Sequence, residues 1–201
     1  MTSIHSVTLE APDAASAGAF YNAAFDLDGQ LNVRESAAPT PGFRGFTLSL
    51  VVSQPATVDE LVGSALEAGA TELKPVKKSL WGYGGVVSAP DGAIWKVATS
   101  SKKNKGPATR EIDDIVLLLG VEDVVASKKF YEDRGLEVKR SFGRKYAEFD
   151  TKNIKLALYG RRALAKDAGV DPDGKGPHRI VVGSDAGPFT DPDGFAWEQP
   201  R

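Results

Sequence analysis

The stretch Ser88-Ala-Pro-Asp-Gly-Ala-Ile-Trp-Lys96 recurs near the C-terminus as Thr190-Asp-Pro-Asp-Gly-Phe-Ala-Trp-Glu198. Pro presets the backbone angle φ for a tight turn, and Gly adopts the left-handed conformation that other residues find costly. Asp-Gly turns are common in hairpins, but the shared position of the Trp favours an internal duplication over coincidence. After the Trp the first copy has Lys96 and the second has Glu198, so only the second hairpin carries a carboxylate at this position.

The residues before the first hairpin predict two strand–helix units. Residues 4–10 alternate as in a half-buried strand, with His5, Val7 and Leu9 on one face, and Asp13 is the expected N-cap of a helix that follows. A second alternating strand, 46–52, precedes a helix that we expect to begin at a capping box formed by Thr57 and Glu60. Strands at 72–76 and 84–87 complete the second unit, whereas the first unit lacks a hairpin.

The second half of the chain repeats this plan. A strand at 112–119 and a helix at about 123–134 carry Phe130-Tyr131, which echoes Phe20-Tyr21 in the first helix. Strands follow at 136–142, 145–150 and 154–159, then a short helix at 161–168. The last unit has a strand at 178–182 but no helix before its hairpin. We therefore predict an N-terminal half at 1–100, a linker at 101–110 that is rich in Lys and Ser, and a C-terminal half at 111–201.

The amino-acid composition limits the classes of protein to which this chain can belong. The 201 residues are 41% hydrophobic and 26% charged, with a formal net charge of −2, which gives no electrostatic reason to expect nucleic acid or an anionic membrane as partner. The absence of Cys excludes disulfides and thiol chemistry. No apolar run approaches the length of about 20 residues that spans a bilayer, and no signal peptide is recognisable at the N-terminus. A cytoplasmic protein is the expectation.

Four such units in this order resemble the vicinal oxygen chelate superfamily, which includes glyoxalase I, bleomycin-resistance proteins and extradiol dioxygenases. The resemblance covers almost the whole chain and rests on 4–9, Phe20-Tyr21, 68–70, the two Pro-Asp-Gly turns, 112–117 and Phe130-Tyr131. It implies an α+β fold of repeated βαβββ units, two of them abridged, that form two cupped mixed β-sheets with helices outside. It also implies a small-molecule ligand in a cup, and either a homodimer or a monomer whose paired repeats resemble a dimer.

Metal-dependent relatives take ligands from the first strand of a unit and from the residue four after the hairpin Gly. The first-half equivalents Ser6, Thr47 and Lys96 do not suit a cation. In the second half the resemblance implies Asp114, His178 and Glu198 as ligands for Zn²⁺, Ni²⁺, Mn²⁺ or Fe²⁺, with Glu198 as the proton-shuttling catalytic group. The alternative is that these three are unrelated polar residues and that no metal binds.

Aromatic and basic side chains on the hairpins and second-half strands are candidates for ligand binding, because planar ligands suit cups lined by aromatic rings with a few fixed donors. The candidate substrate-binding residues are Trp81, Tyr83, Arg144, Tyr146, Tyr159 and Arg179. For Trp95 and Trp197 a place in the core beneath the helices is at least as favoured.

Three functions remain open on this basis. The first is a metal-dependent lyase or isomerase of the glyoxalase type that acts in the second half. The second is a metal-free protein that sequesters a small aromatic or antibiotic-like compound. The third is a regulatory homologue whose abridged units serve association. Whether the chain is an enzyme is not decided by the sequence.

Overall fold

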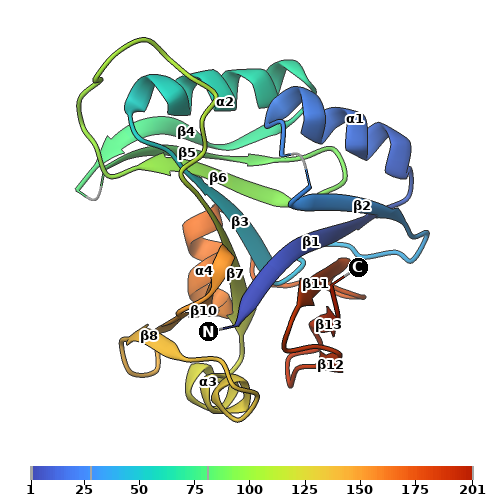
Figure 1. Ribbon diagram of the computed structural model, residues 1–201. Helices are drawn as coiled ribbons and strands as arrows, with labels where there is room; N and C mark the ends of the chain where they lie inside the picture. Colours follow the sequence, from blue (N-terminus) through green and yellow to red (C-terminus); the bar gives the residue numbers. More distant parts are fainter. Residues whose placement is uncertain (1, 28, 81, 201) are drawn as a thin grey trace.

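The computed structural model describes residues 2–27, 29–80 and 82–200, and it combines helices with a long, curved β-sheet (Figure 1). The helices of this part of the chain are α1 (Ala14–Ala24), α2 (Pro55–Glu67), α3 (Val124–Glu132) and α4 (Arg161–Ala168). Its strands are β1 (Ser3–Ala11), β2 (Leu31–Glu35), β3 (Phe46–Val51), β4 (Thr71–Ser79), β5 (Gly82–Ser88), β6 (Ile94–Thr99), β7 (Asp114–Val121), β8 (Val138–Ser141), β9 (Tyr146–Phe149), β10 (Lys152–Gly160), β11 (Ile180–Ser184), β12 (Phe189–Thr190) and β13 (Ala196–Glu198).

These elements form four units that begin with β1, β3, β7 and β11. The second and third units each contain a strand, a helix and three further strands. The first unit is shortened to β1, α1 and β2, and the fourth consists of β11, β12 and β13 without a helix among the described residues. The predicted α+β fold of repeated units, two of them abridged, is therefore confirmed.

Strand pairing joins the second unit to the third and the first to the fourth, and a short parallel pairing of β1 with β10 links the two resulting parts, which we call the inner and the outer sheet, into one continuous sheet. The inner sheet, in the order β4-β5-β6-β3-β7-β10-β9-β8, is centred on the antiparallel pair β3–β7, where Leu48 lies opposite Leu117. The outer sheet, β2-β1-β11-β13-β12, is centred on the antiparallel pair β1–β11, where Val7 lies opposite Val182. Each sheet thus combines a unit from either side of the 101–110 linker, and the division into halves at 1–100 and 111–201 stays a prediction.

The Tyr of each Phe-Tyr motif binds an Asp of one of the two hairpin turns. The Tyr21 hydroxyl of α1 donates to Asp91 Oδ1 in the first hairpin at 2.8 Å, and the ring of Tyr21 lies 5.4 Å from that of Trp95. Tyr131 of α3 donates instead to Asp191 Oδ2 at 2.6 Å, two residues before Asp193, which is the counterpart of Asp91, and the ring of Tyr131 lies 5.3 Å from that of Trp197. Both Trp side chains are buried, so the Tyr–Trp packing is repeated, whereas the Asp that accepts the Tyr hydroxyl stands at a different position in each hairpin.

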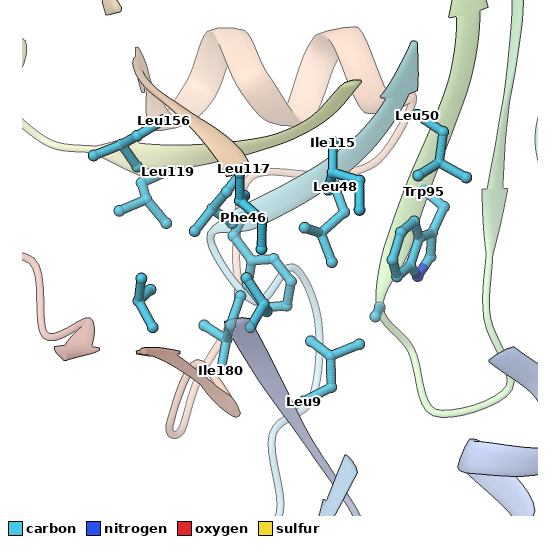
Figure 2. Packing of buried hydrophobic residues seen from close by; sticks show 14 of the residues in the cluster. Leu9, Phe46, Leu48, Leu50, Trp95, Ile115, Leu117, Leu119, Leu156 and Ile180 are labelled. Carbon is cyan, nitrogen blue, oxygen red and sulfur yellow. The ribbon is translucent and has the colours of Figure 1, made fainter. Parts of the chain in front are cut away.

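One hydrophobic core lies between the two sheets and under the helices. Figure 2 shows Leu9 and Ile180, from β1 and β11, facing Phe46, Leu48 and Leu117, from β3 and β7. All five side chains are almost completely excluded from solvent. Because side chains alternate along a strand, the residues between them on the inner sheet, such as Thr47, Ser49 and Lys96, lie on the opposite face, which we call the open face.

Helix α4 departs from the expectation that all helices lie outside the cups, because it packs on the open face. Its apolar side chains Leu164, Ala165 and Ala168 form a second hydrophobic cluster with residues of the inner sheet and the preceding loop, including Phe43, Val86 and Ile94. Charged residues occupy the rest of this amphipathic helix. The helix therefore fills one end of the open face.

Two local predictions are wrong. Helix α2 begins at Pro55, not at a Thr57–Glu60 capping box, because Pro suits the first helical turn; Thr57 is fully buried inside the helix. His5 does not share a face with Val7 and Leu9, since the β1–β11 register shifts between Ile4 and Ser6 and leaves His5 exposed beside Asp185. The N-cap at Asp13 is confirmed, with its carboxylate accepting the Ser16 amide. None of the described helices is long and apolar enough to cross a bilayer.

Candidate functional site

A cavity of about 430 Å³ opens beside α4 on the open face of the inner sheet. Apolar groups from Val51, Pro75, Val86 and Ala98 form its walls. Three lysines also line it, Lys74, Lys77 and Lys96. A cavity of this size with apolar walls and a few charged groups is typical of small-molecule sites. We call it the lysine pocket.

The C-terminal end of α4 organises two of these lysines. The Lys96 Nζ lies 2.9 Å from Asp167 Oδ2, and Lys74 Nζ donates to the backbone carbonyls of Lys166 and Asp167 at 2.9 and 2.6 Å. These carbonyls lie in the last turn of α4, at the negative end of the helix dipole, so they favour a cation there, although the Lys166 carbonyl also accepts the amide of the C-cap Gly169. Asp167 is the acidic residue that lines the pocket against three lysines. The pocket therefore has an excess of positive charge.

Tyr83 is the predicted ligand-binding residue that lines the lysine pocket. Its hydroxyl, however, donates to Asp59 Oδ1 of α2 at 2.8 Å, and this hydrogen bond raises the pKa of the Tyr83 phenol. The hydroxyl is therefore already engaged, and only the aromatic ring of Tyr83 can contact a ligand in the pocket.

Tyr146 and Tyr159 come together at the other end of the inner sheet. Their ring centroids are 6.0 Å apart on β9 and β10. Burial, followed by the charge of Glu148, raises the pKa of Tyr146 to about 12. The two rings lie several strands from the lysine pocket.

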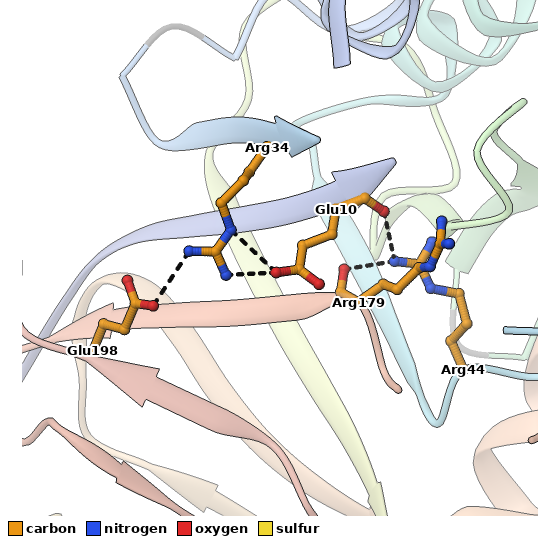
Figure 3. A network of polar contacts seen from close by, with 5 residues as sticks. All are labelled: Glu10, Arg34, Arg44, Arg179 and Glu198. Carbon is orange, nitrogen blue, oxygen red and sulfur yellow. Dashed lines mark hydrogen bonds and ion pairs between the residues drawn. The ribbon is translucent and has the colours of Figure 1, made fainter. Parts of the chain in front are cut away.

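The other candidates for ligand binding lie elsewhere. Arg144 is exposed in the β8–β9 turn. Arg179 is buried at the start of β11, where its carbonyl accepts a hydrogen bond from Arg44 and its own Nε has no partner among the described residues (Figure 3). Trp81 lies outside the described residues. The five predicted residues that the structure describes therefore do not form one site.

The three predicted metal ligands are not brought together. Asp114 Oδ1 lies 3.9 Å from Lys155 Nζ on the neighbouring strand. Both ring nitrogens of His178 face backbone carbonyls, with Nδ1 2.6 Å from the Arg44 oxygen and Nε2 2.9 Å from the Asp193 oxygen. Within residues 2–27, 29–80 and 82–200, no group of three His, Asp or Glu side chains is arranged to hold a metal ion. The donor set does not fit the ion that the resemblance implied.

Glu198 is instead paired with an arginine of the outer sheet. Figure 3 shows the Arg34 guanidinium between the two carboxylates of Glu10 and Glu198, with Nη1 3.3 Å from Glu198 Oε1 and Nε 3.1 Å from Glu10 Oε1. The hydrogen bond to Glu10 is the main cause that raises the pKa of Arg34. The permanent charge of this guanidinium offsets the negative charge that a divalent ion would need.

Lys74 and Lys77 were missed by the sequence reasoning, which used Lys96 only as an argument against a metal. The strand that carries Lys74 and Lys77 has irregular register against β5, so simple alternation does not indicate which face each occupies. The covering by α4 is a long-range contact that no local pattern signals. The local sequence signal that could have indicated this pocket was the number of Lys residues on the strands next to the first Pro-Asp-Gly hairpin.

Comparison with known proteins identifies the fold through structure alone, since no family model and no curated protein sequence matches the chain. A variant of glyoxalase I from Zea mays aligns with 98% of this chain and 91% of its own, at a TM-score of 0.61 and 13% identity. Another structure of glyoxalase I from Zea mays aligns with 92% of this chain and 75% of its own, again at a TM-score of 0.61 and 13% identity. A candidate dioxygenase from Bacillus subtilis aligns with 90% of this chain and 69% of its own, at a TM-score of 0.55 and 12% identity.

These alignments span almost the whole chain and agree with the four-unit order. At such low identity they establish the architecture and leave the chemistry to the residues of this chain. The protein therefore has the fold of the vicinal oxygen chelate superfamily, as its repeated motifs predicted.

Proposed function

We propose that this chain binds a small anionic molecule with an apolar or aromatic body in the lysine pocket, without a metal ion. The observation that carries this proposal is the convergence of Lys74, Lys77 and Lys96 on a cavity of about 430 Å³ with apolar walls. The alternative of a metal-dependent lyase has no ligand set to support it among the described residues.

The charges indicate how the ligand binds. Lys74 is held by two carbonyls of α4, whereas Lys96 is held by the side chain of Asp167, which is half-exposed. A ligand carboxylate takes the place of the Asp167 carboxylate at Lys96 and gains a further cation in Lys77. The apolar body of the ligand then lies against Val86 and Ala98.

Calorimetric titration with 2-naphthoate and with its neutral amide, 2-naphthamide, tests this proposal. The carboxylate binds and the amide binds at least about tenfold more weakly, since a hydrogen bond to a charged group contributes about 1.5–3 kcal/mol. Lys96→Met lowers the affinity for 2-naphthoate by a similar factor. The matched control Lys152→Met, on an exposed residue outside the pocket, leaves it unchanged.

The same titration in EDTA separates this function from metal chemistry. Affinity for 2-naphthoate is the same with EDTA as with added Zn²⁺ or Ni²⁺. Binding that requires either ion, or equal affinity for the acid and the amide, would overturn the proposal.

A further inference from the structure

Two hairpin tips of the inner sheet expose large apolar side chains. Leu80, between β4 and β5, is 87% exposed, and Phe142, between β8 and β9, is 58% exposed. Among the described residues the other exposed large hydrophobic side chains are Leu66 and Val125. The hairpins form opposite edges of the inner sheet, and Figure 1 shows both tips pointing to the same side of the molecule. Nothing in the fold itself explains such exposure at both tips.

Each apolar tip is flanked by cations. Lys77 and Lys78 precede Leu80, and Arg144 and Lys145 follow Phe142. Within the described part of the chain, these four side chains have no ion pair or hydrogen bond. By contrast, Lys139 and Arg140 lower on the β8–β9 hairpin both bind Glu148, at 2.9 and 2.6 Å. The charges at the tips are therefore available to an external partner.

The linker adds two cations beside the β4–β5 tip. Ser100, just before the linker, packs so closely on Gly82 that a side chain at Gly82 would lie 2.9 Å from the Ser100 Cα. Lys102 and Lys103 follow within three residues and are exposed. We call the two tips and these lysines the tip surface: Lys77, Lys78, Leu80, Lys102, Lys103, Phe142, Arg144 and Lys145.

We propose that the tip surface is a peripheral contact for an anionic membrane surface. Apolar side chains at loop tips enter the headgroup layer, while neighbouring Lys and Arg side chains attract anionic lipids. The net charge of −2 argued against a membrane partner, but charges more than about 10 Å away are screened at physiological salt, so the local charge decides. A single-stranded nucleic acid fits less well, because Leu80 offers no ring for base stacking and the tips lie at opposite edges of the sheet.

This contact would also place the lysine pocket next to the bilayer. Lys77, Ser79 and Gly82 line the pocket and belong to the β4–β5 hairpin that carries Leu80. An amphipathic anion could then pass between the headgroup layer and the pocket. The membrane contact does not depend on that passage, and it is tested without any pocket ligand.

Cosedimentation of the full chain with vesicles tests the inference. The protein binds vesicles of phosphatidylcholine that contain about 30% phosphatidylserine, and it does not bind phosphatidylcholine alone. Binding weakens between about 0.1 M and about 0.5 M salt, because the electrostatic part is screened. The double variant Leu80→Ser/Phe142→Ser partitions at least about tenfold more weakly, since two apolar side chains no longer leave water.

Charge and apolar controls make the result specific. Lys78→Gln/Lys145→Gln weakens binding and reduces its salt dependence. Leu66→Ser and Lys175→Gln remove an exposed apolar side chain and an exposed cation outside the tip surface, and they leave binding unchanged. Unaltered thermal melting shows that each variant is folded.

Three results would overturn the inference. The first is no binding to the anionic vesicles at low salt. The second is an equal loss of binding in the tip variants and in the Leu66→Ser and Lys175→Gln controls. The third is binding of a single-stranded oligonucleotide, abolished by the tip variants, in the absence of vesicle binding.

Discussion

The hydroxyl of Tyr131 donates a 2.6 Å hydrogen bond to Asp191 Oδ2 in the interior of the protein. The other oxygen of Asp191 accepts the backbone amides of Asp193 and Phe195, so this one carboxylate both closes the hairpin turn and anchors it to α3. In the first hairpin Tyr21 and the backbone amide of Ala93 both donate to Oδ1 of Asp91, which stands at the position of Asp193 and not of Asp191. Each helix Tyr therefore binds a carboxylate of the hairpin turn beside the buried Trp, but from a different position of the turn in each copy.

Tyr131→Phe and Tyr21→Phe should each lower the free energy of unfolding by about 1–3 kcal/mol, because each removes a hydrogen bond from a tyrosine hydroxyl to a carboxylate in the hairpin turn. Urea denaturation measures the loss. Tyr146→Phe is the control, since its hydroxyl lies 3.4 Å from a carboxylate in a half-buried position and should matter less. Stabilities of Tyr131→Phe and Tyr21→Phe equal to that of the wild type would contradict the role assigned to the motif.

Gly92→Val and Gly194→Val should each destabilise the fold by about 1–3 kcal/mol, because φ is +89° and +93° and a β-branched residue is strained there. At Gly92 an added Cβ meets nothing within 4 Å, so the cost is backbone strain and not a clash. Gly18→Ala, in the interior of α1 with open space around its Cβ, should instead stabilise by about 0.5–1 kcal/mol. Thermal melting of the three variants shows whether each is less stable or more stable than the wild type.

Asp167→Asn should raise the affinity for 2-naphthoate about twofold to fivefold, because it frees Lys96 from a partly exposed ion pair that contributes at most about 1 kcal/mol. Asp133→Asn is the matched control, since it removes the exposed pair with Lys129 on α3. Calorimetry should show no change in affinity for the control. A fall in affinity on Asp167→Asn would mean that the Asp167 carboxylate itself contacts the ligand.

Glu148 should contribute to stability in a pH-dependent manner. Burial raises the pKa of its carboxyl, but hydrogen bonds from Arg140 and Lys139 outweigh burial and leave the folded-state pKa below its usual value. A carboxyl with a depressed folded pKa contributes stability above its unfolded pKa and loses it as pH falls through the folded pKa. The difference in unfolding free energy between wild type and Glu148→Gln should therefore shrink on acidification from about pH 6 to about pH 3. A difference that does not vary with pH would contradict the pairing.

Glu198→Gln should change stability by no more than about 1 kcal/mol, because its pair with Arg34 is partly exposed to solvent. Zn²⁺ titrations of the wild type and of Glu198→Gln should be alike, since the guanidinium of Arg34 already neutralises this carboxylate. Elemental analysis of the wild type and of Glu198→Gln after incubation with Zn²⁺, Ni²⁺, Mn²⁺ and Fe²⁺ should likewise show the same metal content in both proteins. A stoichiometric metal in the wild type that the variant loses would restore the metalloenzyme hypothesis.

The order of the units was predictable from the sequence because its signals are local. Alternation in β1, the N-cap at Asp13 and the left-handed glycines 92 and 194 each depend on residues a few positions apart. Repetition of these signals then identified the fold, since two hairpins with the same Trp position require equivalent surroundings. The missing hairpin and the missing helix were visible for the same reason.

The site was decided by tertiary structure. The lysine pocket exists because α4 lies on the open face and ends beside Lys74 and Lys96, some seventy to ninety positions earlier in the chain. Glu198 stands at the expected offset from Gly194, but its carboxylate is paired with the guanidinium of Arg34, which lies 164 positions away in the sequence. The sequence offset determines which strand position a residue occupies. Strand pairing and helix packing determine which groups lie beside that residue. Those neighbouring groups decide whether a carboxylate there meets a metal ion or an arginine.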